Sequence, residues 1–318
     1  MLSPLISTDI ALAARRLADG GLVAIPTETV YGLAADAAQG DAVGRIFDVK
    51  RRPRDHPLIV HLAGLHALDG WAHEVTPAVE QLAQACWPGP LTMIVRRGPR
   101  AIDAVTGGRD TVGLRVPAHP MALELLERLQ GGLAAPSANR FGRVSPTTAQ
   151  HVVDDLGDAL DPARDLVLDG GPCPVGVEST IVDLTVEPPQ VLRAGAIDAA
   201  TVGALLATPV AGASGERRAS GMLASHYAPA CEVVLADDAD EAERRREALE
   251  RSGTRAAVLD RTDDLIAAAR LLYADLRDAD AAGLDALVVV LPAAAGLGHA
   301  LRDRLFKAAA GGGHRAEP

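Results

Sequence analysis

Two cationic residues in the first quarter of the chain, Lys50 and Arg52, carry side chains well suited to binding an anion. Lysine offers a phosphate a compact point charge, and arginine offers it a planar fork of N–H donors. Val43 and Ile46 fall on helical spacing, which predicts a short amphipathic helix that ends at these cations. A cationic helix end can also serve only to complement the helix dipole, and for Arg51 the two interpretations carry equal weight. Lys50 and Arg52 therefore predict a phosphate site.

A third cation, Arg115, lies on a predicted strand at residues 111–116. Thr111, Gly113 and Arg115 alternate with apolar residues, so they share one face of that strand. A buried or half-buried arginine needs an anion, because an unpaired charge in a low dielectric is costly. Either a protein carboxylate or a ligand can supply that anion. The space left by Gly113 favours a ligand.

The string Pro-Thr-Glu-Thr-Val-Tyr-Gly-Leu at residues 26–33 follows a predicted buried strand at residues 22–25. Pro26 ends that strand, and hydrogen-bonding side chains follow it directly. Open α/β sheets bind ligands at the carboxyl ends of their strands. For any one of these residues, an ordinary strand-to-helix turn is the better interpretation. The full string predicts a binding site.

Three more positions combine a structural and a functional interpretation. His61 lies on a predicted strand at residues 57–62, where a lone histidine is more often structural. Ser137-Ala138-Asn139 ends a short strand with small residues that allow a close backbone approach. Ser145, followed by Pro146, predicts the start of a helix with Ser145 as its N-cap. Because a helix N-terminus attracts anions, a nucleotide phosphate could lie there.

Composition limits the class of protein. The chain has 318 residues, 48% apolar and 23% charged, which is typical of a folded protein of two domains. A net charge of −11 argues against binding nucleic acid through the overall field of the protein. Cys86, Cys173 and Cys231 are widely spaced, so we expect free thiols and no zinc or other resident metal site. We expect a soluble, cytoplasmic protein without a signal peptide or membrane segment.

The positions of strands and helices predict two α/β domains. Residues 1–210 mix short elements irregularly, residues 211–229 read as a linker, and residues 230–312 alternate strand and helix, which predicts a small parallel sheet. A tail at residues 313–318 is expected to be disordered. Predicted strands lie at residues 22–25, 58–62, 91–95, 111–116, 133–135, 166–168, 180–184, 191–193, 232–235, 256–259 and 286–291. Predicted helices begin near Thr8, Asp41, Thr76, Pro120 and Ser145, and others span residues 240–251, 265–276 and 297–309.

Together these motifs resemble those of the threonylcarbamoyl-AMP synthase family in its long, two-domain form. In the catalytic, YrdC-type domain they are the string at residues 26–33, Lys50-x-Arg52-Pro53, residues 111–117, Ser137-Ala138-Asn139 and Glu178-Ser179-Thr180. In the second domain they are His226-Tyr227-Ala228-Pro229, Gly296-Leu297-Gly298 and Asp303-Arg304-Leu305. The resemblance implies a twisted mixed sheet with helices, the YrdC-type fold, followed by a smaller Rossmann-like domain.

The resemblance also implies a nucleotidyltransferase reaction in which L-threonine, bicarbonate and ATP, with Mg²⁺, give L-threonylcarbamoyl-AMP and pyrophosphate. A transferase complex would then modify tRNA, and weak contact with tRNA is compatible with this role. By position, Lys50 and Arg52 would be catalytic, and L-threonine would be held by Thr29, His61, Arg115, Ala135 and Ser179. ATP would be held by Lys50, Arg52, His56, Thr111, Ser137, Asn139, Ser145 and Arg193, with Tyr227 of the linker closing over it as a lid.

Two departures from the family pattern stand out. His56 occupies a position where asparagine is usual, and residues 219–225 read Ala-Ser-Gly-Met-Leu-Ala-Ser in place of the usual Ser-Pro-Gly-Met-Lys-Tyr-Arg. Two alternative functions share the YrdC-type fold. A carbamoyltransferase of hydrogenase maturation is disfavoured because the chain has no Cys-x-x-Cys pair, and an RNA-binding module is disfavoured by the net charge of −11.

Overall fold

The computed structural model describes residues 3–214 and 226–311. Contacts divide the chain into two units. The first unit contains Met1–Phe141, Pro146–Pro174 and Glu178–Met222, and the second contains Leu223–Pro318 together with the short segments Gly142–Ser145 and Val175–Val177. Most of the predicted linker, including its departures at residues 219–225, and the predicted tail at residues 313–318 lie outside the described residues.

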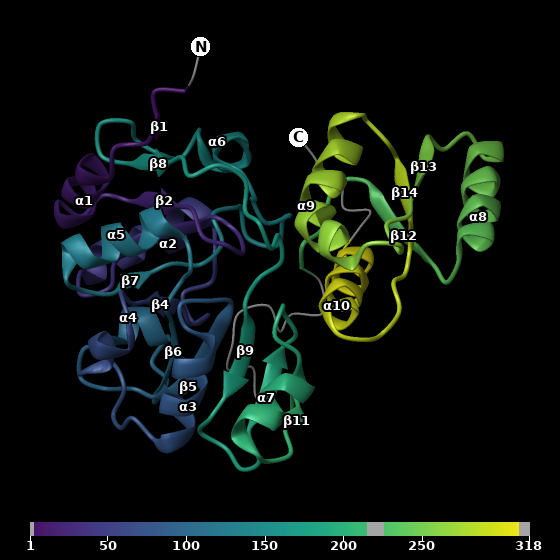
Figure 1. Ribbon diagram of the computed structural model, residues 1–318. Helices are drawn as coiled ribbons and strands as arrows, with labels where there is room; N and C mark the ends of the chain where they lie inside the picture. Colours follow the sequence, from purple (N-terminus) through teal and green to yellow (C-terminus); the bar gives the residue numbers. More distant parts are fainter. Residues whose placement is uncertain (1–2, 215–225, 312–318) are drawn as a thin grey trace. The chain divides into compact units, whose positions relative to one another are not determined.

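The first unit is built on a mixed sheet of eleven strands within the described residues, in the order β1-β8-β2-β3-β7-β4-β6-β5-β9-β10-β11 (Figure 1). This confirms the predicted mixed sheet. The strands are β1 (Ile6–Ser7), β2 (Val23–Ile25), β3 (Gly32–Asp36), β4 (Ile59–His61), β5 (Leu91–Arg96), β6 (Thr111–Arg115), β7 (Leu133–Ala134), β8 (Leu166–Leu168), β9 (Thr180–Asp183), β10 (Gln190–Arg193) and β11 (Ala211–Gly212).

Helices of the first unit cover both faces of this sheet and bury its apolar side chains. On one face, Leu17 and Leu125, from α1 and α5, pack against Val23 and Leu133. On the other face, α2, α3 and α6 contribute to the largest cluster of the core. The helices are α1 (Ile10–Ala18), α2 (Gly40–Lys50), η1 (Leu65–Leu68), α3 (Pro77–Cys86), α4 (Asp103–Thr106), α5 (Pro120–Leu129), α6 (Ala149–Leu156) and α7 (Ala199–Leu206).

Two local predictions in the first unit are wrong. Residues 26–31 do not lead from a strand into a helix, because they connect β2 to the antiparallel strand β3, with Ile25 opposite Gly32. Ser145 does not begin a helix either. Helix α6 begins at Ala149, and its N-cap is Thr148, whose hydroxyl accepts a hydrogen bond from His151 N at 3.2 Å. The structure therefore provides no helix N-terminus at Ser145 to bind a phosphate.

The second unit contains a parallel sheet of three strands in the order β12-β14-β13, which confirms the predicted parallel sheet. Helix α8 lies on one side of the sheet, and α9 and α10 lie on the other (Figure 1). The elements are β12 (Glu232–Ala236), α8 (Ala239–Arg251), β13 (Ala256–Leu259), α9 (Leu265–Ala281), β14 (Ala286–Val290) and α10 (Leu297–Ala309).

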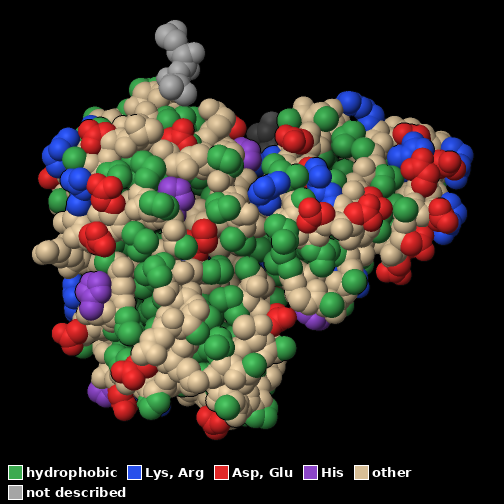
Figure 2. Space-filling view, viewed as in Figure 1, with side chains coloured by type: hydrophobic (Ala, Val, Ile, Leu, Met, Phe, Trp, Pro, Cys, Tyr) green, Lys and Arg blue, Asp and Glu red, His purple; other side chains and the backbone are tan. Residues whose placement is uncertain are grey.

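The surface of the second unit mixes acidic and basic side chains, as Figure 2 shows around α8. Arg246 pairs with both Glu243 and Glu250, and Arg245 pairs with Glu241 one helical turn away. These pairs are typical of a solvated helix face. Within residues 3–214 and 226–311, no helix is long and apolar enough to cross a membrane.

Candidate active site

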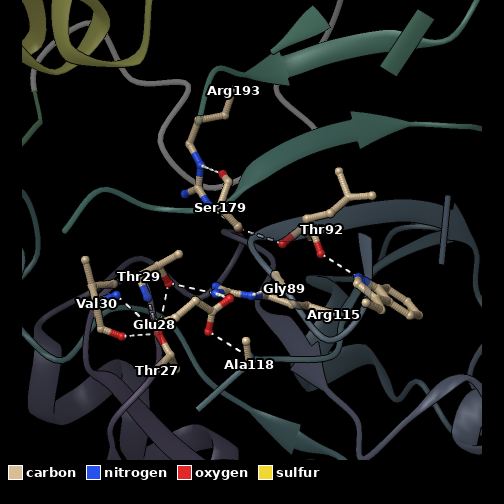
Figure 3. Close-up of polar contacts among 12 residues, drawn as sticks. Thr27, Glu28, Thr29, Val30, Gly89, Thr92, Arg115, Ala118, Ser179 and Arg193 are labelled. Carbon is tan, nitrogen blue, oxygen red and sulfur yellow. Dashed lines mark hydrogen bonds and ion pairs between the residues drawn. The ribbon is translucent and has the colours of Figure 1, made fainter. Parts of the chain in front are cut away.

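Thr27 shapes the loop between β2 and β3. Its hydroxyl donates to Val30 O at 2.6 Å and accepts from the backbone N–H groups of Thr29 and Val30 at 3.1 and 3.2 Å. Its proton is therefore used, so the 2.9 Å contact between the Thr27 and Thr29 hydroxyls has Thr29 as donor. This tight turn directs Glu28 and Thr29 toward Arg115 (Figure 3).

Arg115, at the end of β6, is paired with a carboxylate of the protein itself. Its Nη2 donates to Glu28 Oε1 at 2.7 Å and to Thr29 Oγ1 at 2.8 Å, and its Nε donates to Gly89 O at 3.3 Å. The space beside Gly113 favoured a ligand as the anion next to Arg115, but the buried carboxylate of Glu28 supplies that charge instead. Nη1 forms no hydrogen bond with a residue of the described ranges, so one edge of the guanidinium is left for a ligand.

The carboxylate of Glu28 is held in its ionised form. Burial by itself raises the pKa of this carboxyl, but the charge of Arg115 and the hydrogen bonds from Arg115 and Ala118 N hold the pKa below its usual value. The bond from Ala118 N to Glu28 Oε2 is 2.9 Å long. Glu28 therefore neutralises Arg115 and fixes the direction of its fork.

His61 lies beside Arg115 on the neighbouring strand. The parallel register of β4 and β6 pairs His61 with Arg115, while Val60 and Leu114 face the core on the opposite side. Burial, and secondly the charge of Arg115, lowers the pKa of His61 to about 3. The imidazole is therefore neutral at physiological pH. Its Nδ1 is buried and has no hydrogen-bond partner among the described residues.

Ser179 lies at the centre of a second polar group, formed by three neighbouring strands. Thr92 Oγ1 on β5 lies 2.8 Å from Ser179 Oγ, and Arg193 on β10 donates to Ser179 Oγ and to Ser179 O, both at 3.0 Å (Figure 3). All three side chains are buried. The hydroxyl of Ser179 is therefore fixed in direction by its neighbours on both sides.

Lys50 is buried at the last position of α2. Its Nζ donates to Ser137 O at 2.6 Å and to Asn139 O, and only 1% of the residue is exposed. Burial, and then the charge of Arg52, lowers the pKa of the Lys50 ammonium well below its usual value. Lys50 thus ties the Ser137–Asn139 turn to the end of the helix.

The three cations at the end of α2 differ in their surroundings. Arg51 is the exposed C-cap of the helix, with φ of 52°. Arg52 is buried, donates to Pro57 O at 3.2 Å, and lies with Cζ 5.6 Å from the centre of the Phe141 ring. His56 contacts the same ring edge-on at 5.3 Å. The structure therefore separates Arg51, as a helix cap, from the buried pair Lys50 and Arg52.

The remaining predicted site residues lie in both units. Thr111 begins β6, and Ala135 follows β7 with its N–H donating to Ile59 O at 2.9 Å. Ser145 is fully buried within the segment Gly142–Ser145 of the second unit. Tyr227, also of the second unit, has φ of 62° and stacks on Tyr273 at 5.6 Å. The first unit thus brings Thr29, His61 and Arg115 together, and Lys50 with Ser137 and Asn139.

The family model described as "Telomere recombination", for Sua5, YciO and YrdC, matches residues 15–195, and the model described as "Threonylcarbamoyl-AMP synthase, C-terminal domain" matches residues 191–310. The threonylcarbamoyl-AMP synthase of Pyrococcus abyssi is 39% identical over 94% of this chain and 93% of its own, and that of Bacillus subtilis is 35% identical over 95% and 93%. The chain belongs to the threonylcarbamoyl-AMP synthase family. A crystal structure of P. abyssi Sua5 complexed with L-threonine has a TM-score of 0.88 with this chain, at 37% identity and with 96% of each chain covered.

Two residues of this synthase site were not predicted from the sequence. Glu28 lies in the motif at residues 26–33 without a predicted role, and Thr92 lies outside all of the predicted motifs. Thr92 carries a detectable signal, because Leu91, Met93 and Val95 face the core and Thr92 is a polar residue on the opposite face of a buried strand. Glu28 carries no such signal, since its partner Arg115 lies 87 residues away.

Proposed function

We propose that this member of the synthase family is a nucleotidyltransferase that converts L-threonine, bicarbonate and ATP into L-threonylcarbamoyl-AMP and pyrophosphate. The amine of threonine joins the carbon of bicarbonate with loss of water, and an oxygen of the resulting carbamate joins the α-phosphate of ATP as pyrophosphate leaves. A transferase complex downstream consumes the product in tRNA modification.

The buried group of Thr29, His61 and Arg115 is the observation that carries the proposal. The carboxylate of L-threonine accepts hydrogen bonds from Arg115, whose Nη1 is available and whose other nitrogens are fixed by Glu28, Thr29 and Gly89. The imidazole of His61 is neutral, so it does not repel the amine and its Nδ1 can accept a hydrogen bond from it. Ser179 and Ala135 complete the threonine site in this proposal.

ATP in this proposal is held by the cationic residues Lys50, Arg52 and Arg193, together with His56, Thr111, Ser137, Asn139, Ser145 and Tyr227. Arg52 is the stronger candidate for direct phosphate contact, because the ammonium of Lys50 already binds two carbonyl oxygens. Lys50 instead holds the turn that carries Ser137 and Asn139. Magnesium enters bound to ATP, as part of the substrate, and no group of three or more His, Cys, Asp or Glu ligands is found among the described residues.

The decisive experiment measures pyrophosphate release from ATP by the purified protein with and without L-threonine and bicarbonate. We expect pyrophosphate, not phosphate, and we expect product only when threonine is present. Alanine and glycine serve as matched amino acids without the β-hydroxyl. Equal rates with alanine, glycine or no amino acid would refute the proposal.

A further inference from the structure

Two short segments of the chain, Gly142–Ser145 and Val175–Val177, group with the second unit, although the residues on both sides of each belong to the first. The residues at their ends are hydrogen bonded within the first unit. Phe141 N donates to Lys50 O and Tyr31 N donates to Pro146 O, both at 2.9 Å. Thr180 N donates to Pro90 O, also at 2.9 Å. The first segment is therefore flanked directly by residues held in the first unit, and the second lies between Cys173, whose N–H donates to Thr147 O at 2.9 Å, and Thr180.

Helix α9 and Ala228 hold the first segment within the second unit. The guanidinium Nη2 of Arg277 donates to Val144 O, directly before Ser145 in the chain. Ala228 N donates to Gly142 O at 3.1 Å, and Arg143 pairs with Ala228 in a parallel bridge. The backbone of this segment is thus held by a helix side chain and by the residue that follows Tyr227.

The second segment contacts the backbone of α9 directly. Gly176 has φ of +81°, and a Cβ at this position would overlap Ala269 O and the Arg270 Cα, with Arg270 O at 2.7 Å. Because these are backbone atoms of a helix, they cannot move aside as a flexible side chain can. Glycine is therefore required here for close approach as well as for its φ value.

Both segments adjoin residues of the candidate active site. Asn139 precedes the first segment by three residues, and Ser145 is its last residue. The second segment ends at Val177, two residues before Ser179, whose hydroxyl is fixed by Thr92 and Arg193. A shift of the first segment acts directly on Ser145, which belongs to it, and only Glu178 separates the second segment from Ser179.

We propose that helix α9 positions both segments for catalysis, with Arg277 acting on the ATP side through Ser145 and Gly176 acting on the threonine side through Ser179. These are positioning residues and touch no substrate. The proposal rests on the function proposed above. It gives the second unit a role in the reaction that does not depend on a lid.

A pair of glycine variants tests the threonine side. Gly176→Ala introduces a Cβ that overlaps α9, whereas Gly171→Ala has a similar φ of +80° and no atom within 4 Å of the added Cβ. Both carry the strain of alanine in a left-handed conformation, so the comparison isolates the helix contact. We expect Gly176→Ala to raise the KM for L-threonine about tenfold and Gly171→Ala to leave it within about twofold. Equal effects of the two variants on this KM would overturn the proposal.

A pair of arginine variants tests the ATP side. Arg277→Met removes the hydrogen bond to Val144 O, and Arg270→Met changes an exposed arginine on the same helix. We expect Arg277→Met to raise the KM for ATP about fivefold or more without changing that for threonine, and Arg270→Met to change neither. A fall in kcat of Arg277→Met with both KM values unchanged would indicate that Arg277 has a merely structural role, and it would overturn the proposal for the ATP side.

Amide hydrogen exchange in the absence of substrates separates this proposal from the proposed function. We expect faster exchange at residues 175–179 in Gly176→Ala than in Gly171→Ala, and at residues 142–145 in Arg277→Met than in Arg270→Met. Equal exchange within each pair would refute the positioning role even if wild-type activity is as proposed. Conversely, absence of threonine-dependent pyrophosphate release in the wild type would refute the function while the exchange data still decide whether α9 holds the segments.

Discussion

His61 and Arg115 are partners in the parallel register of β4 and β6, so both side chains lie on the face of the sheet opposite the main core. Arg115 is charged and balanced by Glu28, whereas His61 is neutral because burial and the neighbouring guanidinium disfavour its protonation. A charged guanidinium and a neutral imidazole therefore lie side by side. This pairing suits a molecule that has a carboxylate next to an amine.

Replacing Arg115 by lysine should separate threonine binding from ATP binding. Arg115→Lys keeps the charge near Glu28 but loses the planar fork that reaches Glu28, Thr29 and Gly89 at once. We expect the KM for L-threonine to rise about tenfold, with a smaller rise for ATP, in steady-state pyrophosphate assays. Arg96→Lys, on the exposed end of β5, is the matched control and should change neither constant. An unchanged threonine KM in Arg115→Lys would identify Arg115 as purely structural.

The buried neutral histidine should make stability depend on pH. His61 has a folded pKa of about 3, below its unfolded value near 6.5, so the unfolded chain binds a proton that the folded protein does not between these values. This cost is absent above about pH 6.5 and grows as pH falls toward 3, by at most about 1.4 kcal/mol per pH unit. We expect chemical unfolding curves of His61→Asn to lose stability less steeply than wild type between pH 6 and pH 4. Parallel slopes for the two proteins would contradict a buried neutral His61.

The three cations at the end of α2 should respond differently to removal of their charge. Lys50→Met leaves the carbonyls of Ser137 and Asn139 without their ammonium partner, which costs about 1–3 kcal/mol for each buried acceptor. We expect a lower unfolding midpoint and about a hundredfold loss of activity as the turn shifts. Arg52→Met should reduce activity to a similar extent, and Arg51→Met, at the exposed helix cap, should change little. If urea unfolding and activity are alike in all three variants, the buried pair has no special role.

Thr92 should act on threonine binding through Ser179. Thr92→Val keeps the shape of the side chain and removes its hydrogen bond to Ser179 Oγ. Since Arg193 still holds Ser179, we expect a stability loss of only about 1 kcal/mol and a rise of a few fold in the threonine KM. Thr180→Val is the control, because its hydroxyl bonds Ile197 instead; it should lower stability without changing that KM. If Thr180→Val raises the threonine KM and Thr92→Val leaves it unchanged, Thr92 has only a structural role in the core.

Local patterns were sufficient to predict many of the elements. A helix was predicted to begin near Thr76, and the structure has Thr76 as the N-cap of α3 with its hydroxyl accepting from Val79 N. Alternating polarity placed Thr111, Gly113 and Arg115 on one face of β6, as observed. Strand and helix alternation predicted the parallel sheet of the second unit. In each case the signal lies within a few residues, where backbone preference and burial act directly.

The partners of the site residues were decided only by the tertiary structure. Arg115 could be predicted to need an anion, but its pairing with Glu28 depends on a loop 87 residues earlier in the chain. Ser145 had a strong local capping signal, yet Thr148 three residues later is the N-cap of α6. Thr92 and Ser179 meet because β5 and β9 are parallel neighbours. The sequence by itself determined which side chains could do chemistry and on which face of a strand they lie. Strand order and long-range packing decided which of them meet, because pairing energies between distant segments leave no periodic trace in the chain.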